Sequence, residues 1–117
     1  MTGGRASGAS VCTGGGGGSS LYAGSKAFVS TFTRALAKEL APDRIRVNAV
    51  SPGVIDTPMT AATRADPTRL AGFLKRTPAG RMGQPDEVAA AVLFLASPLA
   101  SYVNGTTLPV DGGFLAT

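Results

Sequence analysis

A helical pattern followed almost directly by a strand pattern is the feature that most limits what this chain can form. Large apolar side chains recur at every fourth position, as on the buried stripe of an α-helix, at Phe28, Phe32, Leu36 and Leu40. Pro42 ends this pattern, and residues 45–50 then form a run rich in β-branched side chains, which is typical of a strand. A helix joined to a strand by a short connection is half of a β-α-β unit. We therefore expect an α/β fold with a parallel sheet.

The remainder of the chain adds a long connection, a second helix and a final strand. Residues 56–80 are poorly periodic and rich in Thr, Pro and Arg, with one short amphipathic helix expected around Leu70 to Leu74, so they are predicted to form a functional loop or lid. Pro85 follows Gln84 at the expected start of the next helix, and two carboxylates come directly after it, facing the positive end of the helix dipole. Residues 106–110 indicate a final strand.

Composition divides the chain into two parts. Residues 1–19 are dominated by Gly, Ser, Ala and Thr, including an unbroken glycine run at 14–18, and offer little to bury. They are expected to be a flexible leader, and residues 20–117 a partial domain. Hydrophobic residues make up 44% of the chain and charged residues only 15%, which favours faces that are buried in a larger sheet or against another subunit.

Several function classes are disfavoured by simple counts. The net charge of +4 is spread along the chain and forms no basic block, so nucleic-acid binding is not expected. With one cysteine, Cys12, and no histidine, the chain has no intrachain disulfide framework and none of the usual zinc or serine–histidine sites. No apolar run is long enough to span a membrane. We expect a cytoplasmic protein without a metal site.

Tyr22 and Lys26 are the residues that carry candidate chemistry. They lie four apart at the start of the predicted first helix, so their side chains are expected on one face. A phenol is a poor base at neutral pH, but a nearby ammonium stabilises the phenolate and lowers the phenol pKa. Such a tyrosine can exchange a proton with a substrate oxygen. Taken alone, the pair fits an amphipathic boundary tyrosine beside a solvated lysine better than a catalytic pair.

The surrounding motifs point to one family. In order, the chain contains Tyr-Ala-Gly-Ser-Lys-Ala from residue 22, Ile-Arg-Val-Asn-Ala-Val-Ser-Pro-Gly from 45, Gly-Arg-Met-Gly-Gln-Pro-Asp-Glu-Val-Ala from 80, Val-Asn-Gly from 103 and Val-Asp-Gly-Gly from 110. Together these closely resemble the second half of the short-chain dehydrogenase/reductase family, in the branch that includes 3-oxoacyl-carrier-protein reductases. The resemblance implies the C-terminal part of a Rossmann-type, doubly wound parallel sheet whose N-terminal nucleotide-binding half is missing.

The resemblance also assigns roles to individual residues. Tyr22 resembles the catalytic acid/base, and Lys26 the lysine that lowers the tyrosine pKa and hydrogen-bonds the nicotinamide ribose of NAD or NADP. Further cofactor-binding positions are implied at Pro52, Gly53, Ile55 and Thr57. Ser10 matches the catalytic serine if the glycine-rich loop is one residue shorter than usual, although no hydrophobic strand precedes it. Residues 2–8 match the family's phosphate-binding glycine turn only imperfectly.

Two functions remain open at this stage. The first, implied by the resemblance, is an NAD(P)-dependent oxidoreductase that transfers a hydride to or from a small carbonyl or alcohol substrate, here in truncated form. The second is an inactive fragment that acts only as an oligomerisation or interaction module. Either way a homo-oligomer is expected, because a half-sheet exposes apolar edges.

Overall fold

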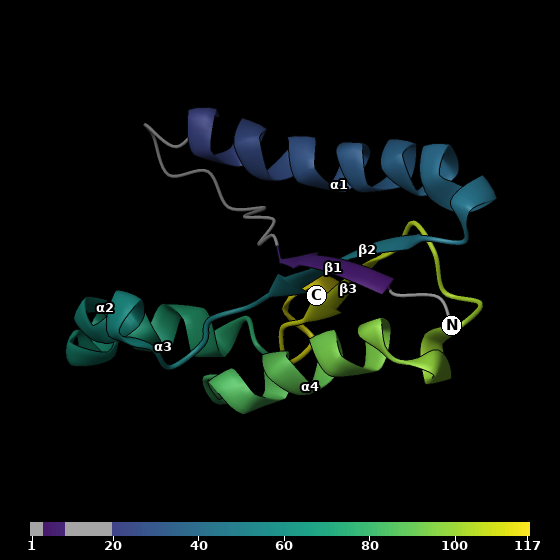
Figure 1. Ribbon diagram of the computed structural model, residues 1–117. Helices are drawn as coiled ribbons and strands as arrows, with labels where there is room; N and C mark the ends of the chain where they lie inside the picture. The colour runs from purple at the N-terminus through teal and green to yellow at the C-terminus, as the bar shows by residue number, and fades with distance from the viewer. Residues whose placement is uncertain (1–3, 9–19) are drawn as a thin grey trace.

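A three-stranded parallel sheet forms the centre of the computed structural model, which describes residues 4–8 and 20–117, with side chains for Leu21 and residues 24–117. Its main elements are β1 (Gly4–Gly8), α1 (Ser20–Leu40), β2 (Arg46–Pro52), α2 (Ala61–Ala65), α3 (Pro67–Lys75), α4 (Pro85–Ala96) and β3 (Thr107–Val110). The strand order is β1-β2-β3. Helix α1 covers one face of the sheet and α4 the other, while α2 and α3 extend from one edge (Figure 1). The expected α/β class is confirmed.

The core is centred on β2. This strand pairs in parallel with β1 on one side and with β3 on the other, and six of its seven residues are buried. Ala49 and Val50 are at most 1% exposed, and Leu95 of α4 is 2% exposed against the sheet. Helices on both faces of the sheet explain why β2 is buried on both sides, its polar residues included.

Buried polar side chains fasten β2 to the loop before β3. The guanidinium of Arg46 donates to the carbonyl oxygens of Val103 (3.0 Å) and Ser97 (3.1 Å). The amide of Asn48 donates to the carbonyl of Val103 (2.9 Å) and accepts from the backbone N–H of Thr106 (3.1 Å). These bonds pair the terminal nitrogens of Arg46 and the side-chain amide of Asn48, while Nε of Arg46 is buried without a hydrogen-bond partner. They hold the end of β2 that lies far from Pro52.

The predicted buried stripe of α1 is right at Leu36 and Leu40, which are half-buried, and wrong at its two phenylalanines. Among the described side chains of this helix Thr33 and Ala37 are buried, whereas Phe28 is 64% and Phe32 49% exposed, with their rings stacked at a centroid distance of 5.5 Å. The phenylalanines lie one residue, or about 100°, around the helix from the true buried seam. Small side chains occupy that seam because α1 lies close to the sheet, where Thr107 of β3 donates to Ser30 (3.3 Å).

The predicted leader is wrong for Gly4–Gly8, which form β1. Each of these residues pairs with β2, from Gly4 opposite Arg46 to Gly8 opposite Val50. Their sequence, Gly-Arg-Ala-Ser-Gly, has none of the β-branched or aromatic residues that signal a strand. Pairing with β2, and not intrinsic strand propensity, stabilises these residues as a strand. The rest of the predicted leader, including the glycine run, lies outside the described residues.

The second helix begins where the sequence indicated. Gln84 is the N-cap of α4 and Pro85 its first residue, and a capping box joins Gln84 to Glu87. Leu95, Val88, Ala91 and Val92, the predicted stripe, are buried or half-buried. Residues 56–80 hold two helices, α2 and α3, where one was expected, because Asp66 ends α2 and caps α3 by accepting from Thr68 and Arg69 (both 3.0 Å).

Candidate active site at the carboxyl edge of the sheet

The candidate residues gather at the carboxyl edge, the edge at which all three parallel strands end. Helix α1 runs opposite to β2, so its first turns lie at this edge, and the α2–α3 segment projects from it (Figure 1). Tyr22 and Lys26 occupy these first turns of α1, one helical turn apart, and Lys26 is half-buried. The side chain of Tyr22 lies outside the described residues, so the phenol–ammonium contact stays a prediction.

Ser10 also lies outside the described residues. The described backbone stops at Gly8, which pairs with Val50 near the end of β2. A strand therefore does precede Ser10, although not a hydrophobic one, and it ends at the carboxyl edge. The role of Ser10 itself stays a prediction.

Pro52 and Gly53 form the turn that ends β2. The backbone N–H of Gly53 donates to the carbonyl of Val110 (3.0 Å), so this turn is bonded to the end of β3. A Cβ atom at position 53 would lie 2.8 Å from the Cα of Asp111, which is closer than real Cβ contacts. Glycine is thus required at this turn by packing within the protein, whatever the turn binds.

The segment after the turn is held on two sides. On one side Gly83 donates to the carbonyl of Val54 (2.9 Å) and accepts from the N–H of Asp56 (2.8 Å), so that Ile55 and Gly83 form a parallel bridge. On the other side the hydroxyl of Thr60 donates to the carbonyl of Ile55 (2.5 Å). Thr57 belongs to a capping box with Thr60, whose hydroxyl accepts from the Thr57 N–H (3.0 Å).

Ion pairs occur on both sides of this segment. Asp56 pairs with Arg64 of α2. Arg81 forms two bonds with the carboxylate of Glu87, at 2.6 and 2.9 Å. Hydrogen bonds from Arg81, and next from the backbone N–H of Gln84, lower the pKa of Glu87 to about 2, and the same bond raises the pKa of Arg81. The motif that begins at residue 80 contains both residues. The pairing itself was not predicted, because Arg81 precedes the helix that carries Glu87.

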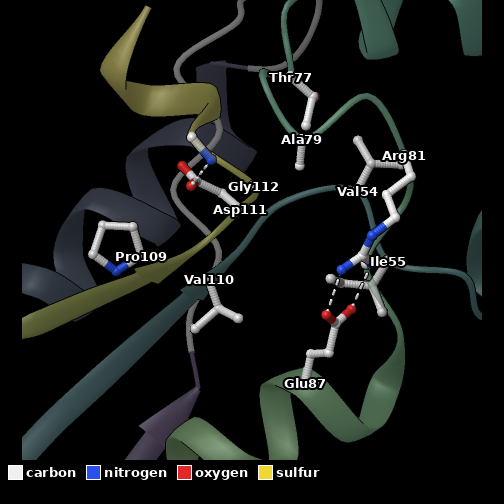
Figure 2. A pocket seen from close by; sticks show the side chains of 12 residues that line it. Val54, Ile55, Thr77, Ala79, Arg81, Glu87, Pro109, Val110, Asp111 and Gly112 are labelled. Carbon is white, nitrogen blue, oxygen red and sulfur yellow. Dashed lines mark hydrogen bonds and ion pairs between the residues drawn. The ribbon is translucent and has the colours of Figure 1, made fainter.

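A cavity of about 290 Å³ adjoins the turn (Figure 2). Its walls consist of Val54, Ile55, Thr77, Ala79, Arg81, Gly83, Glu87 and residues 109–113. The charged groups of its walls already have partners in the protein: Arg81 pairs with Glu87, and the carboxylate of Asp111 accepts from the N–H groups of Gly113 and Leu115 (both 2.9 Å). The cavity therefore offers both aliphatic and polar surface, with its charged groups already paired inside the protein.

The described part of the chain contains neither a cluster of metal ligands nor a membrane-spanning helix. None of its acidic residues gather with others into a group of three or more that could hold a metal ion. None of its helices has the length and apolar character needed to cross a bilayer.

Comparison with known proteins establishes the family. The sequence model of the family described as enoyl-(acyl carrier protein) reductase matches residues 6–115, which is most of the chain. The chain belongs to the short-chain dehydrogenase/reductase family. The match begins inside β1 and so includes residues that the sequence interpretation had assigned to a leader.

Individual members of the family are similar over most of this chain. Galactitol 2-dehydrogenase (L-tagatose-forming) of Cereibacter sphaeroides is 53% identical over 81% of the chain, which covers 37% of that protein. A 3-oxoacyl-acyl-carrier-protein reductase of Vibrio harveyi is 48% identical over 91% of the chain, covering 43% of that protein. A crystal structure of an Agrobacterium tumefaciens dehydrogenase with bound NADP superposes with a TM-score of 0.94 at 43% identity, over 99% of this chain and 48% of that one. The chain thus spans less than half the length of these relatives.

Proposed function

We propose that this short-chain dehydrogenase/reductase chain supplies the proton-transfer and nicotinamide-binding part of an NADP- or NAD-dependent oxidoreductase acting on a small carbonyl or alcohol. The observation that carries the proposal is the placement of two segments at one edge. The first turns of α1, with Tyr22 and Lys26, lie at the carboxyl edge where Pro52 and Gly53 end β2. Ligands of open parallel sheets bind beyond the carboxyl ends of the strands.

The groups at this edge suit the nicotinamide end of the cofactor. Lys26 offers donors for ribose hydroxyls, Ile55 an aliphatic surface and Thr57 a hydroxyl, while the one carboxylate of the segment, Asp56, is neutralised by Arg64. Within the described residues no glycine-rich turn opens a helix to receive the pyrophosphate. NADP bound to a structural relative supports the same class of cofactor.

The proposed chemistry assigns one task to each residue. When bound, the reduced cofactor supplies the hydride. Tyr22 donates the proton of its Oη to the carbonyl oxygen of the substrate, and in the reverse direction its phenolate removes the proton from the alcohol. The ammonium of Lys26 stabilises that phenolate, and Ser10 polarises the carbonyl by donating a hydrogen bond.

Replacing Tyr22 with Phe tests the proton-transfer role. NADPH oxidation is followed with a panel of small ketones and aldehydes, and Tyr22→Phe is expected to lower kcat by roughly 10²–10⁴-fold, the usual contribution of a positioned proton donor. Tyr102→Phe is the matched control, because Tyr102 is fully exposed, and its turnover should equal that of the unchanged chain. If Tyr22→Phe turns over like the control, Tyr22 is not the acid/base.

A second candidate function is supported by one surface. The stacked pair Phe28 and Phe32 lies exposed on α1, on a flank of the helix next to its buried seam. Exposed aromatic pairs on a soluble protein mark interaction surfaces. A chain that associates through α1 without turning over substrate would be an oligomerisation module.

A further inference from the structure

The loop between α3 and α4 makes a bidentate ion pair with the helix that follows it. Both terminal nitrogens of Arg81 donate to Glu87, one to each carboxylate oxygen, at 2.9 and 2.6 Å. A bidentate pair fixes direction as well as distance, because two parallel bonds resist rotation of either group. Figure 2 shows Arg81 reaching from its loop to Glu87 on α4, with Ile55 beside the pair.

Glu87 also fixes the residues between itself and Arg81. Its Oε2 accepts from the backbone N–H of Gln84 (2.8 Å), which is the capping box of α4. Arg81 donates in addition to the carbonyl of Met82 (3.1 Å). The short stretch from Arg81 to Gln84 is therefore bonded at both ends to one carboxylate, and Gly83 lies inside it.

Gly83 connects the held Arg81–Gln84 stretch to the segment that follows the Pro52–Gly53 turn. It donates to the carbonyl of Val54 and accepts from the N–H of Asp56, one residue on either side of Ile55. A Cβ at position 83 would lie 2.7 Å from the Cδ1 of Ile55, so the isoleucine side chain lies directly across the glycine. The backbone and the side chain of position 55 are both set by where Gly83 is held.

We infer that Glu87, acting through Arg81 and Gly83, is a positioning residue that sets the backbone of residues 54–56. In so far as this segment contacts the cofactor, the inference rests on the proposed function. Glu87 touches neither cofactor nor substrate in this account. Its effect reaches the site through the Arg81–Gln84 stretch and its two hydrogen bonds with residues 54 and 56.

Residue-resolved amide hydrogen exchange of the full chain tests the inference without cofactor. Glu87→Ala should speed exchange about tenfold at the amides of Gly83 and Asp56, which depend on the held stretch. The amides of Ala49 and Gly53, which bond to Thr106 and Val110, should not change. Uniformly faster exchange would mean general destabilisation, and unchanged exchange at Gly83 and Asp56 would mean no positioning. Either result overturns the inference.

Two further variants separate the pair from its surroundings. Asp86→Ala is the matched control, since it removes the neighbouring carboxylate in the first turn of α4 but leaves Arg81 paired, and it should leave Gly83 and Asp56 unchanged. Glu87→Gln keeps an acceptor without the charge and should restore part of the protection. Asp86→Ala acting like Glu87→Ala would overturn the inference.

Cofactor affinity is measured on the same proteins by NADPH fluorescence. A positioning role predicts a Kd for NADPH raised severalfold in Glu87→Ala, with Asp86→Ala unchanged. If the unchanged chain binds no NADPH, the proposed function fails for this chain alone, while the exchange measurement still decides whether Glu87 positions the segment. If the chain binds NADPH equally well with and without Glu87, the link from the segment to the cofactor is overturned.

Discussion

Glu87 accepts three hydrogen bonds, two from Arg81 and one from the N–H of Gln84, although both members of the ion pair are largely exposed. Hydrogen bonds to a carboxylate favour its charged form, which is why the pKa of Glu87 falls to about 2. Because the folded-state pKa is depressed, the stabilising effect is fully present above the unfolded value of about 4.5. It is lost as the pH falls toward 2.

A carboxyl NMR titration checks this at the residue scale. In the unchanged chain Glu87 should titrate near pH 2, and in Arg81→Ala its pKa should rise toward 4.5, because the largest cause of the shift has been removed. The remaining bond from Gln84 should keep it somewhat below that value. A Glu87 that titrates identically in both proteins would show that the pair is not formed in solution.

At the scale of elements, the errors in predicting β1 and the buried face of α1 have one physical cause. Propensity and periodicity describe a segment by itself, whereas β1 exists through its ladder with β2. The same limit applies to α1: its extent follows from the sequence, but the buried seam at Thr33 and Ala37 depends on how closely the sheet approaches. By contrast, the start of α4 was predictable because Gln84, Pro85 and Glu87 act within one turn.

In the candidate site, too, some features could be predicted from local sequence and others depend on residues distant in the sequence. Its placement at the carboxyl edge follows from β-α-β topology, which the sequence indicates, whereas the roles of Lys26 and Gly53 are implied by motif and stay predictions. On one side, the segment after the turn is held by bonds between residues about 30 apart, such as Val54 with Gly83, and no local pattern records these bonds. The requirement for glycine at 53 likewise comes from Asp111, the residue that directly follows β3.

Gly53→Ala tests how β2 and β3 are joined. The added Cβ would meet the Cα of Asp111 at 2.8 Å, and a backbone atom cannot move aside without shifting β3. We expect a loss of about 1–3 kcal/mol in the free energy of unfolding, as for other overpacked sites. Gly72→Ala in α3 is the control: nothing lies within 4 Å of its Cβ, and alanine should gain roughly 1 kcal/mol there. Equal unfolding midpoints for the two variants, measured by urea denaturation, would contradict this packing.

At the scale of the whole molecule, the chain matches only part of the architecture of its relatives. It covers less than half of the relatives that it matches, and its described surface exposes large apolar side chains on both α1 and α4. Phe28 and Phe32 on α1 and Leu93 on α4 belong to opposite faces of the sheet. Association through one face can therefore be distinguished from general adhesion.

Sedimentation velocity makes that distinction. If α1 carries the association surface, Phe28→Ser with Phe32→Ser should shift the chain toward monomer, because the exposed stacked pair is lost. Leu93→Ser, which removes an exposed apolar side chain from α4, should leave the distribution unchanged. The reverse pattern would locate the surface on α4 and would contradict the assignment to α1.

The central claim, that the carboxyl edge receives the nicotinamide end of the cofactor, is tested most directly by amide NMR. Reduced nicotinamide mononucleotide is titrated into the chain, with adenosine 2′,5′-bisphosphate, which carries no nicotinamide, as the comparison ligand. If this edge binds nicotinamide, reduced nicotinamide mononucleotide should cause saturable shifts at the amides of Lys26, Gly53, Ile55 and Thr57. Adenosine 2′,5′-bisphosphate should cause none there. Shifts confined to other elements, or equal shifts with both ligands, would contradict it.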